Sequence, residues 1–195
     1  VPSEPNSGPS PLVAMNVTIK SASLRKNPGL QPPGSLMFDC MAAVSAWPSE
    51  SHPLAPTMAM HANSHAVWLN LRDRFPHPYT RNHAVSFIHR VKMNRPETTF
   101  CIEVDGEAVG GIGFMLQHDI ERVSAEIGYW LGEKYWGRGI CTEALCALTN
   151  YAIESHGLTR IFALPFAHNA ASCRVLEKAG YALEGHLRRS AIKDG

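Results

Sequence analysis

Hydrophobic residues follow two different periods along residues 58–195 of the chain. Apolar residues three and four positions apart mark one face of a helix, whereas alternation or short apolar runs between turn residues mark strands. The helical spacing predicts helices at residues 58–71, 81–94, 137–155 and 169–178. The other pattern predicts strands at residues 98–104, 107–116, 124–131, 160–166 and 181–192.

Capping and turn residues support these boundaries. Thr80 is a good N-cap for the helix that follows it, and the first helix is broken near residues 63–64. Asp105-Gly106 is a strong signal for a type I′ hairpin turn between two strands. Gly180 follows the last helix, at a position where glycine commonly ends a helix in a left-handed conformation.

The predicted elements follow the order helix, helix, hairpin, strand, helix, strand, helix, strand. A hairpin gives antiparallel neighbours, whereas two strands joined through a helix pair in parallel. The expected fold class is therefore α/β, in the sense of an α+β mixed sheet. Its central twisted sheet has an antiparallel front half and a βαβ back half, and helices flank it.

The first 57 residues differ in composition from the rest. Ten of the fourteen prolines but only six Asp, Glu, Lys or Arg residues lie in residues 1–57. Proline interrupts helices and central strands, so we expect a Pro/Ser-rich, largely irregular and mostly dispensable segment. Within it, residues 15–19 are predicted as a short strand and residues 36–47 as a short helix. Residues 58–195 form the single folded domain.

Charge and composition exclude several classes of protein. The chain of 195 residues is 45% apolar and 18% charged, with a formal net charge of +1. That balance argues against a nucleic-acid partner, which requires a strongly basic surface. No apolar run reaches the length of a membrane span, and residues 1–5 do not resemble a secretory signal. We therefore expect no membrane partner and a cytoplasmic location.

Metal and disulfide chemistry are not expected either. The five cysteines have irregular spacings without a C-x-x-C pair, which favours reduced and mostly buried thiols. His61 and His65 stand four positions apart, as two ligands on one helix face would, but no third ligand follows at a telling distance. The expectation is therefore that the protein binds no metal.

A glycine-bearing turn between the strand at 124–131 and the next helix is the main candidate for chemistry. Gly137 and Gly139 let the backbone approach a ligand closely and adopt positive φ angles. The first N–H groups of the helix point outward at the positive end of its dipole, and Lys134 and Arg138 add positive charge. This arrangement is typical of a phosphate or pyrophosphate site.

Three phosphate-binding motifs compete for this turn. A Walker A loop fails because Arg138 and Gly139 stand where Lys and Ser or Thr are required. The dinucleotide fingerprint G-x-G-x-x-G fails because Thr142 replaces its third glycine and no acidic residue ends the next strand. The third motif, [QR]-x-x-G-x-[GA], fits residues 134–139 with Lys134 in the first position.

The third motif is the pyrophosphate loop of the GNAT acetyltransferases, and a second GNAT signature follows it. Residues 168–181 resemble the run N-x-x-S-x-x-x-x-x-K-x-G-[FY], which begins here at Asn169. Residues 75–80 and 125–130 add to the likeness. The chain from residue 58 to residue 195 thus resembles the RimJ/RimL type of GNAT N-acetyltransferase, which implies a GNAT-like fold.

The resemblance implies a direct transfer of the acetyl group of acetyl-CoA to an amine, without a covalent enzyme intermediate or a metal. Acetyl-CoA, as co-substrate, would lie between the strands at 124–131 and 160–166, where they splay apart. Its pantetheine would pair with the backbone of residues 129–131, and its pyrophosphate would rest on the N–H groups of residues 136–142. The co-substrate contacts implied in this way are Tyr129, Trp130, Leu131, Lys134, Trp136, Gly137, Arg138, Gly139, Ile140, Cys141, Thr142 and Asn169.

Two residues are candidates for proton transfer. The attacking amine must lose a proton, and the resemblance implies Glu126 as the general base. This residue shares a strand face with Gly128 and Trp130. Its alternative role is a solvent-facing glutamate paired with an arginine. The leaving thiolate needs a proton, but Leu176 stands where many GNAT enzymes have a tyrosine. The resemblance suggests Ser172 as the acid instead, and an ordinary hydroxyl at a helix start is its alternative role.

The chain departs from the family pattern at both ends. Residues 1–57 lack a convincing first strand, because residues 12–20, the candidate for it, lie at the wrong distance from residue 58. The chain stops at the turn 193–195, where the family continues into a last strand. That strand would insert between those at 160–166 and 181–192. We therefore expect a C-terminally incomplete domain with two open sheet edges, lower solubility and lower activity.

The expected function is N-acetylation of an amine acceptor, either a protein N-terminus or a small-molecule amine. The alternative is a catalytically inactive CoA-binding or protein-binding remnant of a GNAT enzyme, and a more distant one is a nucleotide-binding module. A homodimer stays open beside a monomer. The loop at residues 75–79 either lines the acceptor side or serves as a rigid connector.

Overall fold

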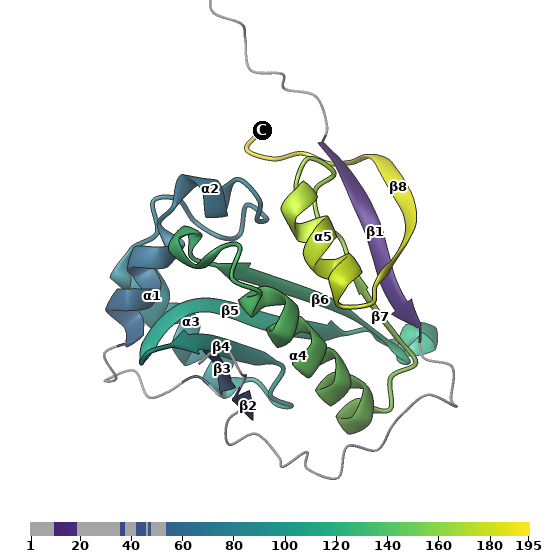
Figure 1. Ribbon diagram of the computed structural model, residues 1–195, viewed down its shortest axis with the longest axis horizontal. Coiled ribbons are helices and arrows are strands. Elements are labelled where there is room, and N and C mark those ends of the chain that lie inside the picture. Colours follow the sequence, from purple (N-terminus) through teal and green to yellow (C-terminus); the bar gives the residue numbers. More distant parts are fainter. Residues whose placement is uncertain (1–9, 19–35, 38–41, 46, 48–53) are drawn as a thin grey trace, which may run out of the picture.

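The computed structural model describes residues 10–18, 36–37, 42–45, 47 and 54–195 of the chain. They form one sheet of eight strands in the order β2-β3-β4-β5-β6-β7-β1-β8, with helices on its faces (Figure 1). The strands are β1 (Ser10–Thr18), β2 (Leu36–Met37), β3 (Ala42–Ser45), β4 (Thr99–Val104), β5 (Glu107–Leu116), β6 (Ser124–Leu131), β7 (Arg160–Ala163) and β8 (Ala182–Ala191). The helices are α1 (Leu54–Ala62), α2 (His65–Trp68), α3 (Arg81–Met93), α4 (Ile140–His156) and α5 (Ala170–Lys178), with 3₁₀ turns η1 (Asp119–Glu121) and η2 (Glu133–Tyr135).

The antiparallel and parallel parts of the sheet meet at β6. Strands β4, β5 and β6 form an antiparallel meander, and β6 pairs in parallel with β7. In the turn between β4 and β5, Asp105 has a φ of 51° and Gly106 a φ of 79°. Two successive positive φ angles are what a type I′ turn requires. The mixed sheet that the order of elements predicts is therefore confirmed.

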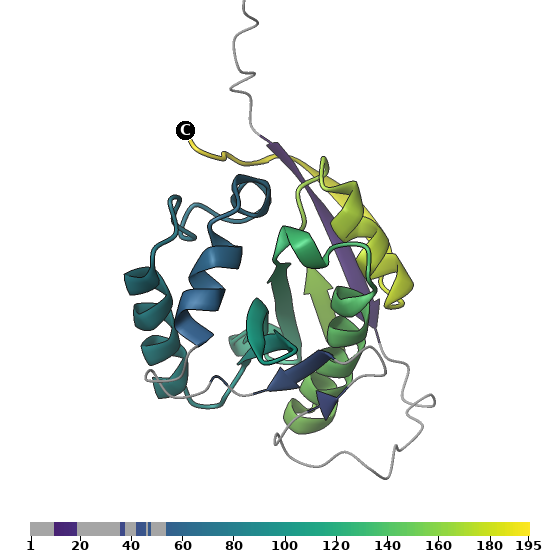
Figure 2. The same cartoon turned by 60° about the vertical axis from the view of Figure 1, so that its left-hand side comes forward.

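Helix α4 covers one face of the sheet, and helices α1 and α3 cover the other (Figure 2). A hydrophobic cluster lies under each. On one face, α4 buries Leu145 and Leu148 in a cluster that includes Ile127 of β6. On the other face, Met58 of α1 and Ile88 of α3 belong to a second cluster. Among the helices that the structure describes, none combines the length and the apolar character needed to cross a membrane.

Capping residues begin and end the helices near the predicted positions. The Thr80 hydroxyl accepts a hydrogen bond from the backbone N–H of His83 at 3.4 Å, which caps α3. The predicted break near residues 63–64 separates α1 from α2, and Ser64 caps α2. Gly157 ends α4 with a φ of 62°. These local signals are strong because each satisfies backbone groups that a helix end leaves unpaired.

Strand β1 lies between β7 and β8 and is antiparallel to both. Its side chains Leu12, Val13 and Met15 are buried, with Met15 only 1% exposed. The expectation of two open edges at this place is wrong, because β1 occupies the position between the two strands. An apolar run suits a strand that has neighbours on both sides.

Residues 36–47 do not form the predicted helix where the structure describes them. They contribute β2 and β3, and β3 pairs with β4. Val44 is buried and Ser45 is half-buried, an alternation that suits a strand. A short apolar segment fits either structure locally, so pairing with β4 decides between them. Helix α1 begins at Leu54 and continues across residues 57–58, the position at which the sequence predicts a domain boundary. The structure does not test that boundary, so it stays a prediction.

Candidate active site

A cleft of about 1470 Å³ opens where β6 and β7 separate. Their parallel ladder ends at the pair Glu126 and Phe162, and β6 continues beyond it to Leu131. The cleft walls include the end of β6, residues 135–142 and the start of α5. A ligand placed here can reach backbone groups of β6 that the ladder with β7 does not use.

The glycine turn forms one end of this cleft. Gly137 has a φ of 76°, and Gly139, the N-cap of α4, has a φ of 83°. A Cβ atom at Gly137 would meet nothing within 4 Å, so the space beside the turn is open. The Trp136 indole N–H donates to the Leu131 carbonyl at 2.8 Å and ties the turn back to β6. The N–H groups of the first turn of α4 thus face a space that can accept an anion.

Two cations flank the turn around one aromatic ring. Lys134 Nζ lies 5.6 Å and Arg138 Cζ 5.4 Å from the centroid of the Tyr135 ring. Both cations are exposed, whereas Tyr135 is buried. Both cations therefore lie against the buried Tyr135 ring. Their positive charge favours a negatively charged ligand at this end of the cleft.

The N-terminus of α5 faces the middle of β6 across the cleft. Asn169 caps this helix, because its side-chain oxygen accepts the backbone N–H of Ser172 at 3.0 Å. The hydroxyls of Tyr129 and Ser172 are hydrogen-bonded at 2.9 Å. Burial raises the pKa of Tyr129 well above its usual range, so its hydroxyl stays protonated. The motif pattern misses this hydroxyl pair, since it gives Tyr129 a backbone role only.

Glu126 lies on the face of β6 that points away from α4 and its hydrophobic cluster. Ala125, Ile127 and Leu131 are buried on the core side, so the predicted alternation of β6 is confirmed. The Glu126 carboxylate accepts a hydrogen bond from the Arg72 guanidinium at 2.5 Å, and its side chain is 19% exposed. This is the arginine partner that the alternative role of Glu126 predicts, although nothing in the sequence points to residue 72.

Aromatic rings line the cleft beside Glu126. Phe75 is stacked on Tyr79 with ring centroids 4.8 Å apart, and it meets Trp130 edge to face at 5.7 Å. All three residues border the cleft, which favours the acceptor-side role for the loop at 75–79. The Tyr79 backbone N–H also donates to the Asn63 side chain at 2.7 Å, so the loop is held rigidly as well.

The segment that follows β8 is tied to the same side of the cleft. The Lys193 ammonium lies 2.7 Å from Asp73 Oδ1 and 3.7 Å from the centroid of the Trp68 ring. Its side chain is only 7% exposed. The hydrogen bond from Lys193, followed by that from the Asp194 backbone N–H, lowers the pKa of Asp73 below its usual range. A segment far along the sequence thus completes the rim of the cleft.

The cleft brings together nearly all the residues that the motifs single out. Lys134 stands outside the cleft wall, next to Tyr135, and the other predicted site residues line it. Burial raises the pKa of the Cys141 thiol to about 12, so this side chain is neutral at physiological pH. No group of three or more metal-ligating side chains occurs among the described residues.

The family comparison agrees with this geometry. Residues 48–182 match the model of the acetyltransferase (GNAT) domain. A parallel strand pair that separates beside a glycine turn and a helix N-terminus is an arrangement that suits a phosphate-bearing ligand. The chain belongs to the GNAT acetyltransferase family.

Curated relatives match about half of the chain. The "Uncharacterized N-acetyltransferase YoaA" of Bacillus subtilis is 37% identical over 89 residues, which are 46% of this chain and 50% of the relative. The ribosomal-protein-serine acetyltransferase of Escherichia coli is 35% identical over 91 residues, 47% of this chain and 50% of the relative. The chain therefore spans about half the length of these relatives.

Solved structures share the fold over most of the chain. RimJ of Mycobacterium smegmatis, solved with CoA-disulfide, is 25% identical with a TM-score of 0.71, covering 84% of this chain and 81% of that one. The microcin C7 self-immunity acetyltransferase MccE, solved with acetyl-CoA and AMP, is 23% identical with a TM-score of 0.72. That match covers 87% of this chain and 93% of MccE.

Proposed function

We propose that the protein transfers the acetyl group of acetyl-CoA to an amine by direct attack. The observation that carries the proposal is the gap between β6 and β7 beside the glycine turn at the N-terminus of α4. This geometry suits a long ligand with an anionic centre and a thioester at one end. Relatives named as N-acetyltransferases and a structural neighbour solved with acetyl-CoA support it.

The binding step divides the co-substrate between two parts of the cleft. The diphosphate is bound by N–H groups of residues 137–141 and by the nearby cations Lys134 and Arg138. The N–H groups of Trp136 and Thr142, at the two ends of the predicted range, already donate to backbone carbonyls. The pantetheine pairs with the backbone of residues 129–131, as an added strand would. The Asn169 amide faces the same gap, where its N–H₂ group can donate to the pantetheine arm. These contacts place the thioester near the middle of β6.

The chemical step begins with removal of a proton from the acceptor ammonium. In the proposed mechanism the Glu126 carboxylate takes that proton, directly or through one water molecule. The neutral amine nitrogen then attacks the thioester carbonyl carbon and forms the new C–N bond. Arg72, hydrogen-bonded to Glu126, orients the carboxylate. The tetrahedral intermediate collapses when the C–S bond breaks and the thiolate leaves.

Ser172 supplies the proton that the thiolate takes up. Its hydroxyl is hydrogen-bonded to the Tyr129 hydroxyl, and the raised pKa of Tyr129 keeps that second hydroxyl protonated. In the proposed mechanism Ser172 regains its proton from Tyr129, and Tyr129 regains one from water in the cleft, so that both hydroxyls are protonated at the end of each turnover. The acceptor, a protein N-terminus or a small-molecule amine, enters past Phe75 and Trp130.

A second candidate function is CoA binding without turnover. The ion pair between Arg72 and Glu126 favours it, because the guanidinium already occupies a carboxylate oxygen that the acceptor ammonium would have to reach. This candidate predicts binding of acetyl-CoA without release of its thiol in the presence of any amine.

A turnover assay separates the two candidates. Purified protein is incubated with acetyl-CoA and a panel of peptides with free N-termini, amino acids, polyamines and aminoglycosides. The proposal predicts thiol release above the rate of hydrolysis, together with a mass increase of one acetyl group in at least one amine. Thermal stabilisation by acetyl-CoA without any acetylated product would instead select the second candidate. If acetyl-CoA neither stabilises the protein nor yields an acetylated product, both candidate functions are refuted.

A further inference from the structure

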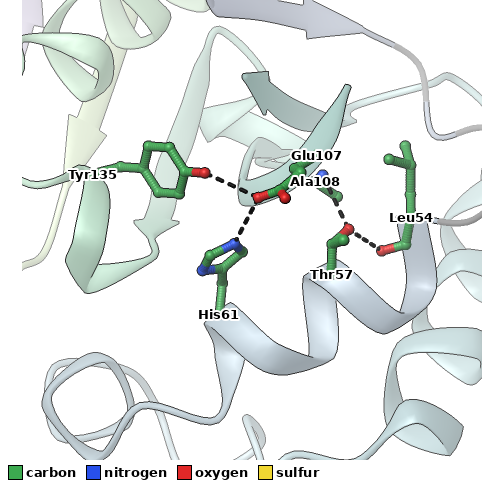
Figure 3. Close-up of polar contacts among 6 residues, drawn as sticks. All are labelled: Leu54, Thr57, His61, Glu107, Ala108 and Tyr135. Carbon is green, nitrogen blue, oxygen red and sulfur yellow. Dashed lines mark hydrogen bonds and ion pairs between the residues drawn. The ribbon is translucent and has the colours of Figure 1, made fainter. Parts of the chain in front are cut away.

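Three polar side chains from distant parts of the chain, those of His61, Glu107 and Tyr135, meet at one carboxylate (Figure 3). Tyr135, the last residue of η2, donates a hydrogen bond from its hydroxyl to Glu107 Oε2 at 3.0 Å. His61 of α1 places its Nε2 atom 3.5 Å from the same oxygen. Glu107 is the first residue of β5, so one carboxylate oxygen joins a helix, a strand and the segment before the turn.

The surroundings of His61 fix the segment that leads into the turn. The His61 and Tyr135 rings meet edge to face with centroids 5.2 Å apart, and both residues are buried. A Cβ atom at Gly132 would lie 2.9 Å from His61 Cβ, so α1 packs directly against the backbone there. The Gly132 N–H donates to the Val109 carbonyl of β5 at 2.7 Å. Residues 132–135 are thus held between α1 and β5.

Helix α1 is itself anchored to the start of β5. The Ala108 backbone N–H donates to the Thr57 hydroxyl at 3.3 Å, and that hydroxyl donates to the Leu54 carbonyl at 3.0 Å (Figure 3). These contacts keep Glu107 and His61 at fixed positions relative to each other. The hydrogen bond from Tyr135, with the contact from His61 second, also lowers the pKa of Glu107, so its carboxylate is charged at neutral pH.

The position of the Tyr135 ring determines where the two cations beside the turn, Lys134 and Arg138, can lie. Lys134 and Arg138 both rest near this ring, and Arg138 is part of the turn itself. A ring that cannot rotate or shift holds these cations where an anion in the turn can meet them. Tyr135 borders the cleft at the anion site, whereas His61 and Glu107 lie outside the cleft wall, behind Tyr135.

We propose that Glu107, Tyr135 and His61 form a positioning network for the diphosphate group of the co-substrate. The inference rests on the proposed function and extends it to residues outside the family motifs. Such a network acts on the diphosphate end of the donor and leaves the thioester chemistry unchanged. Loss of the network is therefore expected to lower kcat/KM for acetyl donors that contain a diphosphate and to leave it unchanged for donors that lack one.

The test compares two donors in one variant. Tyr135→Phe removes the hydroxyl and keeps the ring, and its expected effect is a fall of about tenfold in kcat/KM for acetyl-CoA, the size typical of one hydrogen bond to a charged group. The fall is expected in KM, with kcat changed less than about twofold. For S-acetylpantetheine, which carries no diphosphate, kcat/KM is expected to change less than about twofold.

The control is Tyr181→Phe. The Tyr181 hydroxyl is also buried and is hydrogen-bonded to Thr149 at 2.7 Å, in the hydrophobic core and away from the turn. In this variant kcat/KM is expected to change by the same factor for acetyl-CoA and for S-acetylpantetheine. Glu107→Gln serves as a second variant with the same donor-dependent loss, in case Tyr135→Phe melts at a lower temperature.

The possible results separate this inference from the function on which it rests. Equal losses with the two donors in both Tyr135→Phe and Glu107→Gln would overturn the positioning role and leave the acetyltransferase proposal intact. Where turnover is absent, calorimetric Kd values for CoA and pantetheine replace kcat/KM in the same comparison. Failure of the wild-type protein to bind CoA would overturn the proposed function and this inference together.

Discussion

Single residues determine whether the cleft is a catalyst or only a binding site. Glu126 is the decisive residue, because it is the proposed base and its carboxylate already accepts a hydrogen bond from Arg72. Motif reasoning finds Glu126 from its place on the strand, but it cannot find Arg72, Tyr135 or Glu107. These partners come from other elements, and their contacts arise only when the chain has folded.

Replacing Glu126 with glutamine tests its role as a base. The amide cannot accept a proton, so kcat is expected to fall by about 10²–10⁴-fold, while the Kd for acetyl-CoA changes little. Steady-state kinetics and calorimetry measure the two quantities. Glu154→Gln, at an exposed position on α4, is the matched control. A fall of less than threefold in Glu126→Gln would return Glu126 to the role of a surface carboxylate.

The glycine turn is tested by a substitution whose backbone strain can be matched. Gly139→Val places a branched side chain at a φ of 83° beside the anion site, and binding of CoA is expected to be lost. Gly157→Val introduces the same branched residue at a φ of 62° at the far end of α4. The control is expected to lower the melting temperature by a comparable amount yet bind CoA normally. Calorimetry that finds normal CoA binding in Gly139→Val contradicts the assignment of the turn.

Elements follow the sequence closely where their signals are local. The Asp105-Gly106 turn, the Thr80 cap and the alternation of β6 depend on neighbouring residues, and the structure contains all three. Residues 36–47 are different, since their strands depend on pairing with β4. Strand β7 is shorter than the predicted 160–166 and ends at Ala163, before Pro165, which has no N–H to donate to a ladder.

The contact between the segment that follows β8 and the α2 region is pH-dependent. Because its partners lower the pKa of Asp73 in the folded protein, the contact stabilises the fold above the ordinary pKa of about 3.8 and weakens as pH falls through the lower folded value. NMR titration should therefore show the Trp68 indole resonance shifting as Lys193 leaves its ring in acid. In Asp73→Asn the resonance is expected to differ from the wild type at neutral pH and to lose this transition. An unchanged titration in that variant would exclude the link.

The whole molecule depends on a long-range pairing that no motif predicts. Strand β1 comes from the Pro/Ser-rich part of the sequence but lies inside the sheet, next to strands more than a hundred residues away. Composition favours an irregular segment there, because proline content is an average over residues 1–57. The apolar residues at 12–15 override that average over a short stretch, since the position between β7 and β8 buries them.

Shortening one β1 side chain measures what this pairing contributes. Met15 is 1% exposed, so Met15→Ala is expected to lower the free energy of unfolding by about 2–5 kcal/mol. Met60→Ala makes the same change at a side chain that is 60% exposed on α1, and a change within about 0.5 kcal/mol is expected. Urea denaturation monitored by circular dichroism compares them. Equal effects would mean that β1 does not belong to the core in solution.

Acetyl-CoA is expected to lie in the gap between β6 and β7, beside the turn before α4. Hydrogen exchange followed by mass spectrometry, with and without CoA, tests this placement. Exchange is expected to slow in peptides that cover residues 128–142 and the start of α5, with little change in α3 and in β4. Protection confined to other parts of the chain, or no protection at saturating CoA, would show that CoA does not bind in this gap.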